Sequence, residues 1–573
     1  MHTSMLPIRR IAIIGAGPTG IACAKYFHAE QVFAKIDVFE QRDNVGGIWN
    51  LSGNRASSQI PVPQTDPDYG AGGSRESMSL EFESPLYDYL ETNIPKFLMA
   101  YSDMPFASKL PLFPKNHQVQ EYLEKYAEPV RNKIHFNTQV INVEPIDAKA
   151  CGCSSLNQKW NVASKDLTTG ESREQQYDAV VAAVGHYTVP HIPYVAGLEA
   201  FARKHPGTVM HSKAYRRPED YKNYKILVIG NSASGLDIAG QLAGHAQHPI
   251  YLASRSASQL APKGGGPRWR KDVMEIECFL TNRPNGAVRT VDGEVIEDLD
   301  KVIFATGYFF SFPFLSQNMT SSSSSSSAQS PSSSTSSIDS PQHLNHSARS
   351  KSHTGPLANL TTSGLRVHHI YKHFLNTEYP TLALPVLNLK IIPFPLAENQ
   401  AAVLARLWSG RLDMPSRSEM RQWEHDEEQR LLKANRLRAA RDTASGDTAG
   451  HGIDSGKTDE LKYEGGFHTL VYPEDANQLN SLFSWTKAAR RKDGLENNGE
   501  GKLGTRWDEE SVWLRGRFPD IKAAYTKHGE KRFDITSLSQ LGEEWQNAYK
   551  NWSATTSEDE KRDLFGRAAV EGY

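Results

Sequence analysis

Two glycine-rich turns, each between an apolar run and a helical pattern, constrain this chain more than any other feature. The first turn, GAGPTG at 15–20, follows the β-rich run 11–14. The second turn, GNSASG at 230–235, follows the run 226–229. In a strand–turn–helix unit of this kind, phosphates lie on the free amides at the helix N-terminus, where the helix dipole favours negative charge. Two such turns predict two nucleotide sites and an α/β fold.

The first turn has the spacing of a dinucleotide site. Gly15 permits a tight turn, Gly17 lets the backbone approach a pyrophosphate, and Gly20 lets the helix pack close to the strand. Glu40 ends the next expected strand, and its carboxylate is placed to accept hydrogen bonds from ribose hydroxyls. The alternative, a purely structural glycine turn, is disfavoured because strand, helix and acidic residue all stand in the expected order.

The second turn differs in two ways. Ser232 replaces the middle glycine, and its hydroxyl can donate to a phosphate. The strand after the following helix ends at Arg255 without an acidic residue. A carboxylate there would repel a 2′-phosphate, whereas an arginine accommodates one. We therefore predict FAD at the first turn and NADPH at the second. The alternative for Arg255 is an ordinary solvated arginine.

Composition limits the partners. The 573 residues are enough for two or three domains, and the net charge of −2 gives no reason to expect nucleic acid or an anionic membrane. Four cysteines suit a reducing compartment, and Cys151-Gly-Cys153 is interpreted as two free thiols rather than a metal site. Neither a secretory signal nor an apolar run of about 18 residues is recognisable. We expect a cytoplasmic protein with no membrane span and no metal.

The predicted fold class is α/β, with two dinucleotide-binding Rossmann-like domains. The NADPH domain is inserted into the FAD domain, and a disordered serine-rich loop and a helical C-terminal extension are added. The serine-rich tract cannot bury enough apolar area to offset its ordering entropy. The predicted boundaries are 1–205 and 361–480 for the two parts of the FAD domain, 206–316 for the NADPH domain, 317–360 for the loop and 481–573 for the extension.

Further motifs stand in the order of a known family. They comprise GGIW at 46–49, TNIPKFLM at 92–99, SDMPF at 102–106, VGHYTVP at 184–190, HPGTVMHSKAY at 205–215, FATGY at 304–308 and PFPLAENQ at 393–400. Together with the two turns, they resemble the flavin-containing monooxygenases, of the soluble, fungal-like type. Three positions depart from the family pattern: Phe97 replaces an acidic residue, Val184 a threonine and His205 a phenylalanine.

The resemblance implies a function. Such an enzyme uses NADPH and O2 to oxygenate a soft nucleophilic sulfur or nitrogen atom of a thiol, sulfide or amine through a C4a-hydroperoxyflavin. Asn93 matches the family asparagine whose amide contacts the oxygenated flavin, and it is the predicted catalytic residue. On residue type alone, an asparagine before Ile-Pro is equally a turn residue. Tyr215 stands where related Baeyer–Villiger enzymes usually carry tryptophan, which favours heteroatom oxygenation.

The predicted cofactor-binding residues lie on the two turns, after the second strand and on segments that match the family motifs. They are Gly15, Gly17, Pro18, Thr19, Gly20, Glu40, Gln41, Gly47, Ile48, Trp49, Thr92, Asn93, Val140, Gly230, Ser232, Ala233, Ser234, Gly235, Arg255 and Glu398. Two alternatives remain open, a Baeyer–Villiger oxygenase of ketones and a non-catalytic protein that binds FAD and NADPH. A disulfide reductase is disfavoured because no cysteine pair lies near the first helix. The residues imply no particular oligomeric state.

Overall fold

The computed structural model describes most of the chain, in several stretches. They are residues 8–51, 60–70, 83–146, 158–255, 267–283, 286–315, 357, 360–444, 464–557 and 560–561. The predicted serine-rich loop at 317–360, apart from Leu357 and Leu360, and both Cys151 and Cys153 lie outside these residues.

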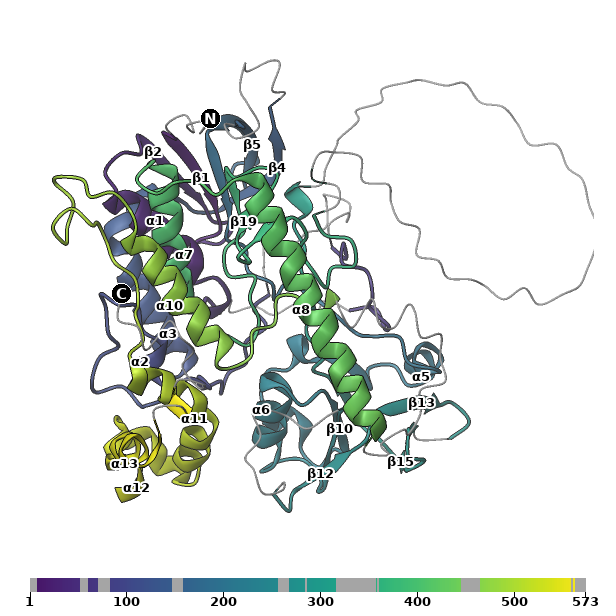
Figure 1. Ribbon diagram of the computed structural model, residues 1–573. Helices are drawn as coiled ribbons and strands as arrows, with labels where there is room; N and C mark the ends of the chain where they lie inside the picture. Colours follow the sequence, from purple (N-terminus) through teal and green to yellow (C-terminus); the bar gives the residue numbers. More distant parts are fainter. Residues whose placement is uncertain are drawn as a thin grey trace, which may run out of the picture.

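The first unit is built on a seven-stranded sheet that draws strands from both parts of the chain (Figure 1). Its order is β18-β19-β20-β7-β1-β2-β3, and β1 pairs in parallel with β2 and β7. The strands are β1 (Arg10–Ile14), β2 (Lys35–Phe39), β3 (Ile134–His135), β7 (Ala179–Ala182), β18 (Ile370–Tyr371), β19 (Leu375–Asn376) and β20 (Leu382–Ala383). The apolar run of β1 is buried because both faces of the sheet are covered.

Helices cover one face of this sheet, and a small antiparallel sheet covers the other. The helices are α1 (Pro18–Ala29), α3 (Asn116–Ala127) and α7 (Pro393–Trp408), and α1 packs against α7. The small sheet contains β4 (Thr138–Pro145), β5 (Trp160–Asp166) and β6 (Ser172–Tyr177). Two separate apolar clusters fill the space between the layers, one on each face.

The second unit contains a parallel five-stranded sheet in the order β12-β11-β10-β16-β9. Its strands are β9 (Val209–His211), β10 (Ile226–Ile229), β11 (Ile250–Ala253), β12 (Arg270–Val273) and β16 (Lys301–Phe304). Helix α6 (Ala233–Leu242) packs on one face of it. On the other side lie α5 (Leu198–Lys204) and the antiparallel strands β13 (Ile276–Leu280), β14 (Ala287–Thr290) and β15 (Val295–Glu297). The predicted α/β class with two Rossmann-like units is confirmed.

The two chain crossings between the units run side by side. Strand β8 (Val189–Pro190) leads into the second unit and pairs antiparallel with β17 (Tyr308–Phe309), which leads out of it. The amide of His191 donates to the carbonyl of Gly307 over 3.0 Å. The crossings therefore form one short two-stranded ribbon rather than two independent linkers.

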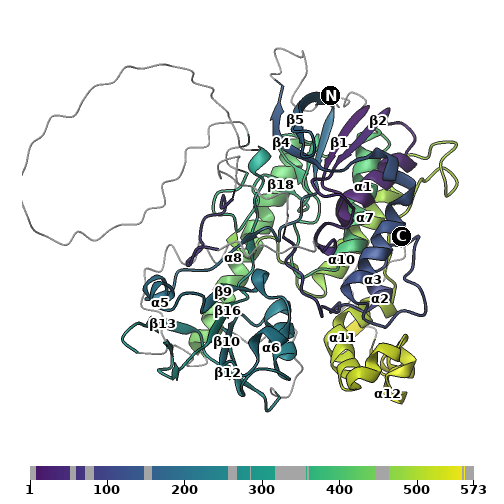
Figure 2. The ribbon, with the colours of Figure 1, turned by 180° about the vertical axis from the view of Figure 1, so that it is seen from behind.

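The C-terminal part is helical, as predicted. Helix α8 (Arg417–Ala444) leaves the first unit and runs towards the second, and α10 (Glu474–Lys487) packs on α7 (Figures 1 and 2). A bundle of α11 (Glu509–Thr526), α12 (Glu543–Gln546) and α13 (Ala548–Thr555) lies beyond α2 (Lys96–Met99). In the described part of the chain, no helix combines the length and apolarity that crossing a bilayer requires.

A fully buried carboxyl group, that of Glu398 on α7, connects three segments that are far apart in the sequence. It accepts hydrogen bonds from the hydroxyl of Tyr26 on α1 at 3.1 Å, from the amide of Ser102 at 3.0 Å and from the hydroxyl of Thr505. Burial raises the pKa of Glu398 from 4.5 to about 7, although these donors act in the opposite direction. The side chain therefore stays protonated in the folded protein at pH values where an exposed glutamate is ionised.

This pKa shift predicts how stability depends on pH. Between pH 4.5 and about 7 the unfolded chain releases the Glu398 proton while the folded chain retains it, so rising pH favours unfolding by up to about 1.4 kcal/mol per pH unit. Glu398→Gln removes this proton, and its melting temperature relative to the wild type should rise from pH 5 to pH 8. Thermal unfolding at several pH values measures it. A difference that is constant with pH would contradict the assignment.

Candidate cofactor sites and the segment between them

The first turn brings the start of α1 against the end of β1. Gly15 has a φ of +98°, and a Cβ on it would lie 2.6 Å from the carbonyl oxygen of Ala183. A Cβ on Gly20 would lie 1.9 Å from the carbonyl oxygen of Gly15. Both distances are far below any real contact, so only glycine fits at these two positions. The structure thus supplies the tight turn and the close helix–strand packing that the sequence predicts.

The residues around this turn fit a bound pyrophosphate. Gly17 caps α1 without a side-chain hydrogen bond, and the first intrahelical bond runs from the amide of Ile21 to the carbonyl of Gly17 over 3.1 Å. The amides of Thr19 and Gly20 therefore have no intrahelical acceptor and can face an anion. A Cβ on Gly47 would lie 3.0 Å from the Cα of Gly17, so backbone rather than side chains lines this approach.

Glu40 follows β2 at the edge of the same turn. Its carboxylate accepts hydrogen bonds from the amide of Ala16 at 2.7 Å and from the amide of Arg42 at 2.9 Å. Burial raises the pKa of Glu40, while these amides oppose the shift. Because the two amides fix the carboxylate beside the turn, its remaining lone pairs are placed to accept from a ribose.

The second turn repeats this geometry. Gly230 has a φ of +109°, and a Cβ on it would lie 2.4 Å from the carbonyl oxygen of Ala305. A Cβ on Gly235 would lie 1.8 Å from the carbonyl oxygen of Gly230. Ser232 is the N-cap of α6 and its hydroxyl caps none of the helix amides, so it remains available to a phosphate. Ala233 and Ser234, in the first helical turn, are exposed.

Arg255 lies just past the end of β11, beside the second turn. The amide of Gly230 donates to the carbonyl of Ala253 at 2.9 Å, which ties the turn to this strand. The side chain of Arg255 is 73% exposed and its guanidinium lies 3.9 Å from the carboxylate of Glu275. A pair this exposed and this long contributes little, so the guanidinium can accept a phosphate partner at small cost.

The segment 84–96 joins the surroundings of the two turns. At one end, the hydroxyl of Ser84 donates to the carbonyl of Ile48, within the GGIW motif. In the middle, the hydroxyl of Tyr87 donates to the carboxylate of Asp237 on α6. The ring of Tyr87 also packs edge-on against Tyr215, with 5.2 Å between ring centroids. One stretch of chain is thereby bonded to both cofactor units.

Asn93 lies on this segment, immediately before α2. The local turn bond is made by Thr92, whose hydroxyl donates to the carbonyl of Ile94 at 2.9 Å. Asn93 itself is exposed, and its amide has no hydrogen-bond partner among the described residues. The bond that a turn-forming asparagine would make is therefore made by its neighbour.

The remaining predicted residues have varied environments. Gln41, Ile48 and Trp49 are half-buried near the first turn, and Trp49 packs against the core on the α1 face. Val140 on β4 is buried in the cluster on the opposite face. The carboxylate of Glu398 is occupied by Tyr26, Ser102 and Thr505.

His211 is placed between the two chain crossings of the second unit. Its Nε2–H donates to the carbonyl of Gly307 at 3.0 Å, and its Nδ1 accepts from the amide of Lys213 at 3.1 Å. Burial lowers the pKa of His211 to about 3. Both ring nitrogens are occupied by backbone groups, so His211 links two backbone segments.

Three charged residues near the sites were missed by the sequence analysis. The guanidinium of Arg42 donates to the carbonyl of Gly47 at 2.6 Å and to that of Asn50 at 2.7 Å, which shapes the GGIW loop. Asp237 accepts a hydrogen bond from the hydroxyl of Tyr87. Glu91 forms ion pairs with Lys522 and Arg532 of the C-terminal extension. Of the three, only Arg42 could have been found from the sequence, because it lies two residues after Glu40.

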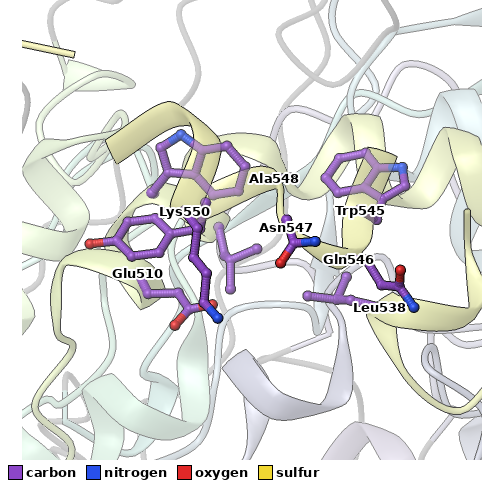
Figure 3. Close-up of a pocket in the computed structure, with 10 residues that line it drawn as sticks. Glu510, Leu538, Trp545, Gln546, Asn547, Ala548 and Lys550 are labelled. Atoms are coloured by element: carbon purple, nitrogen blue, oxygen red, sulfur yellow. The ribbon is translucent and has the colours of Figure 1, made fainter. Parts of the chain in front are cut away.

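A pocket of about 330 Å³, counting its open mouth, lies in the C-terminal bundle and contains no residue of either turn. Figure 3 shows Trp545 and Leu538 on one side of it and Glu510 and Lys550 on the other. It is separate from the cofactor sites. Within the described ranges, no group of three or more His, Cys, Asp or Glu residues could hold a metal ion.

Comparisons with known proteins agree with this geometry. The model of the flavin-binding monooxygenase-like family matches residues 74–279 and 274–328, and that of an NAD(P)-binding Rossmann-like domain matches 13–71. A thiol-specific monooxygenase of Saccharomyces cerevisiae is 29% identical over 409 residues, covering 70% of this chain and 77% of the relative. The flavin-containing monooxygenase iboF of Amanita muscaria is 27% identical over 486 residues, covering 75% and 84%.

Among solved structures, S-allyl-L-cysteine S-oxygenase from Allium sativum has a TM-score of 0.59 at 22% identity, over 97% of this chain and 98% of that one. Tmm from Pelagibacter sp. strain HTCC7211 has a TM-score of 0.57 at 19% identity, over 93% and 92%. These two similarities concern the fold. With the two glycine turns, the family model and the curated relatives in agreement, the comparisons support the flavin-containing monooxygenase family for this chain, and the chain is an FAD- and NADPH-dependent monooxygenase.

Proposed function

We propose that this enzyme oxygenates a soft nucleophilic sulfur or nitrogen atom of a small molecule, by the route through an oxygenated flavin that the family resemblance implies. A thiol is the first substrate class to test, because the Saccharomyces cerevisiae relative is named thiol-specific. The cytoplasmic location of the reaction stays a prediction from the sequence.

One observation carries the proposal. The Asn93 segment is bonded to the GGIW loop through Ser84 and to α6 through Tyr87, so it runs from one cofactor unit to the other. An exposed amide on such a segment is suited to act where hydride transfer and oxygen transfer meet. A protein that only stored the two cofactors would have no need of this bridge.

The residues have distinct roles in this proposal. When bound, the two cofactors supply hydride transfer and the activation of O2. The free amides at the starts of α1 and α6 hold the pyrophosphates, and Glu40 accepts from the ribose hydroxyls of FAD. Arg255 pairs with the 2′-phosphate of NADPH. Asn93 donates its amide N–H towards the negative charge that develops during oxygen transfer.

A coupled assay tests the function and the role of Asn93 together. We expect NADPH oxidation by the wild type to yield oxygenated product from thiols, sulfides or amines rather than from ketones. Asn93→Ala should retain FAD but form product about 100-fold more slowly and release hydrogen peroxide, because a donor to the developing charge is lost. Product and peroxide are quantified against NADPH consumed. Ketone oxygenation would favour the Baeyer–Villiger alternative, and unchanged coupling would remove Asn93 from the mechanism.

Glycine substitutions on α6 test the NADPH site. Gly235→Ala should weaken NADP+ binding at least tenfold without loss of FAD, because its Cβ would meet the Gly230 carbonyl at 1.8 Å and displace the helix start. Gly240→Ala on the same helix meets no atom within 4 Å and should leave binding unchanged. It should also stabilise the helix by up to about 1 kcal/mol. Titration with NADP+ measures both variants, and equal affinities would refute the assignment of the second turn.

Charge reversal at Arg255 tests whether this residue contacts the 2′-phosphate of NADPH. Arg255→Glu should reduce NADPH affinity by about 10- to 100-fold and change NADH affinity little, because a charge-assisted bond is replaced by repulsion. Arg203→Glu is the matched control, since this residue of the same unit is 74% exposed and also pairs with a glutamate. The ratio of kcat/KM for the two nucleotides is the measurement. If both variants keep the wild-type ratio, another residue contacts the phosphate.

A further inference from the structure

The C-terminal extension reaches the Asn93 segment through an ion-pair cluster. The ammonium of Lys522 on α11 lies 3.1 Å from one carboxylate oxygen of Glu91, and the guanidinium of Arg532 donates to the other at 2.6 Å and 3.1 Å. Arg532 lies on the short 3-10 helix η7 (Gly529–Asp534). The three side chains are only 13%, 23% and 19% exposed for Glu91, Lys522 and Arg532. We call these three residues the Glu91 clamp.

Lys522 of the clamp binds the backbone next to Asn93 as well as the side chain of Glu91. The Lys522 ammonium donates to the carbonyl of Thr92 at 3.0 Å. That carbonyl belongs to the peptide plane that joins Thr92 to Asn93, so the same cation orients the plane from which Asn93 projects. With the Thr92 amide bonded to the carbonyl of Pro114 at 2.9 Å, the residue before Asn93 is held on both sides.

The extension that carries the clamp is itself anchored beside this segment. The amide of Leu112 donates to the carbonyl of Ile535 at 2.8 Å, and the rings of Phe113 and Tyr525 lie 4.9 Å apart. Ile521 and Tyr525 of α11 are buried in one cluster with Leu112 and Phe113, and Ile94 packs against that cluster. A movement of α11 would therefore be transmitted to the Asn93 segment.

Each charged group of the clamp interacts with groups of opposite charge, and Lys522 interacts with two carboxylates. Burial would raise the pKa of Glu91, but Lys522 and Arg532 outweigh it and hold the pKa below its ordinary value. Burial lowers the pKa of Lys522, which Glu91 and Asp237 oppose. Asp237 belongs to α6 and is bonded to Tyr87. Lys522 thus faces one carboxylate from each cofactor unit.

From these contacts we infer that Glu91, Lys522 and Arg532 are positioning residues for Asn93, and that the C-terminal extension thereby completes the oxygenation site. The inference rests on the proposed role of Asn93, whereas the mechanical connection stands on the contacts alone. Lys522 lies 430 residues after Thr92 and outside the matched family segments. The extension is accordingly a part of the active enzyme and more than a peripheral addition.

The first readout is amide hydrogen exchange of the segment 88–97 in the purified full-length holoenzyme. In Lys522→Met, exchange of the Thr92 and Lys96 amides should accelerate about tenfold, because a half-buried charge-assisted bond is lost. Lys527→Met, an exposed lysine at the end of α11, is the matched control and should match the wild type. Lys522→Arg, which retains the charge, should restore most of the protection.

The second readout is coupling. Lys522→Met should retain FAD and the KM for NADPH but divert NADPH oxidation from product to hydrogen peroxide, while Lys527→Met should not. If Lys522→Met does not fold, Arg532→Lys, which loses the two-point contact, takes its place. Exchange equal to that of Lys527→Met overturns the inference. Accelerated exchange in an enzyme whose wild type oxygenates none of the substrate classes leaves the positioning role intact and refutes the proposed function instead.

Discussion

The contact between each cofactor helix and the carbonyl of its own turn glycine is the constraint on which the other features depend. At Gly20 and Gly235 a Cβ would come within 2 Å of that carbonyl, so both helices begin directly against their strands. Gly15 and Gly230 also lie close to the ends of neighbouring strands, where a Cβ would meet the carbonyl oxygens of Ala183 and Ala305. The chain crosses between the units just after these two positions. The same backbone contacts therefore place the amides that are predicted to bind phosphate and the crossing ribbon.

Buried and half-buried carboxyl groups connect segments that the sheets do not join. Glu398 connects α7 to α1 and to the segment around Thr505, Asp237 connects α6 to Tyr87, and Glu91 connects the Asn93 segment to the extension. A buried charged or polar group gains little net stability, because its desolvation offsets most of the attraction to its partners. Removing one partner is nevertheless costly, since the other is left uncompensated. These carboxyl groups therefore contribute mainly to the specificity of the arrangement of the connected segments and less to its stability.

The division between what was predictable and what was not follows sequence distance. Strands, helices and the two turns are coded by local patterns, and the predicted fold class and helical C-terminal part are confirmed. The resemblance led to Glu398 as a cofactor residue, whereas its carboxylate is occupied by groups from distant segments. The Glu91 clamp joins residues more than 400 positions apart, and no local pattern marks such a pair. The domain boundaries and the roles of the cofactor residues stay predictions.

The role proposed for Asn93 shows why a distant segment matters to the chemistry. An amide that stabilises developing charge has to stay in place, because it acts only while its donor points at that charge. Yet Asn93 is exposed, and its own turn is closed by a single local bond from Thr92. Most of its rigidity must therefore come from outside the turn. The inferred source is the bond from Lys522 to the preceding carbonyl, and the apolar contacts of α11 hold Lys522 in turn. If Asn93 acts as proposed, the geometry of oxygen transfer depends on residues that neither touch a cofactor nor lie near the glycine turns in sequence.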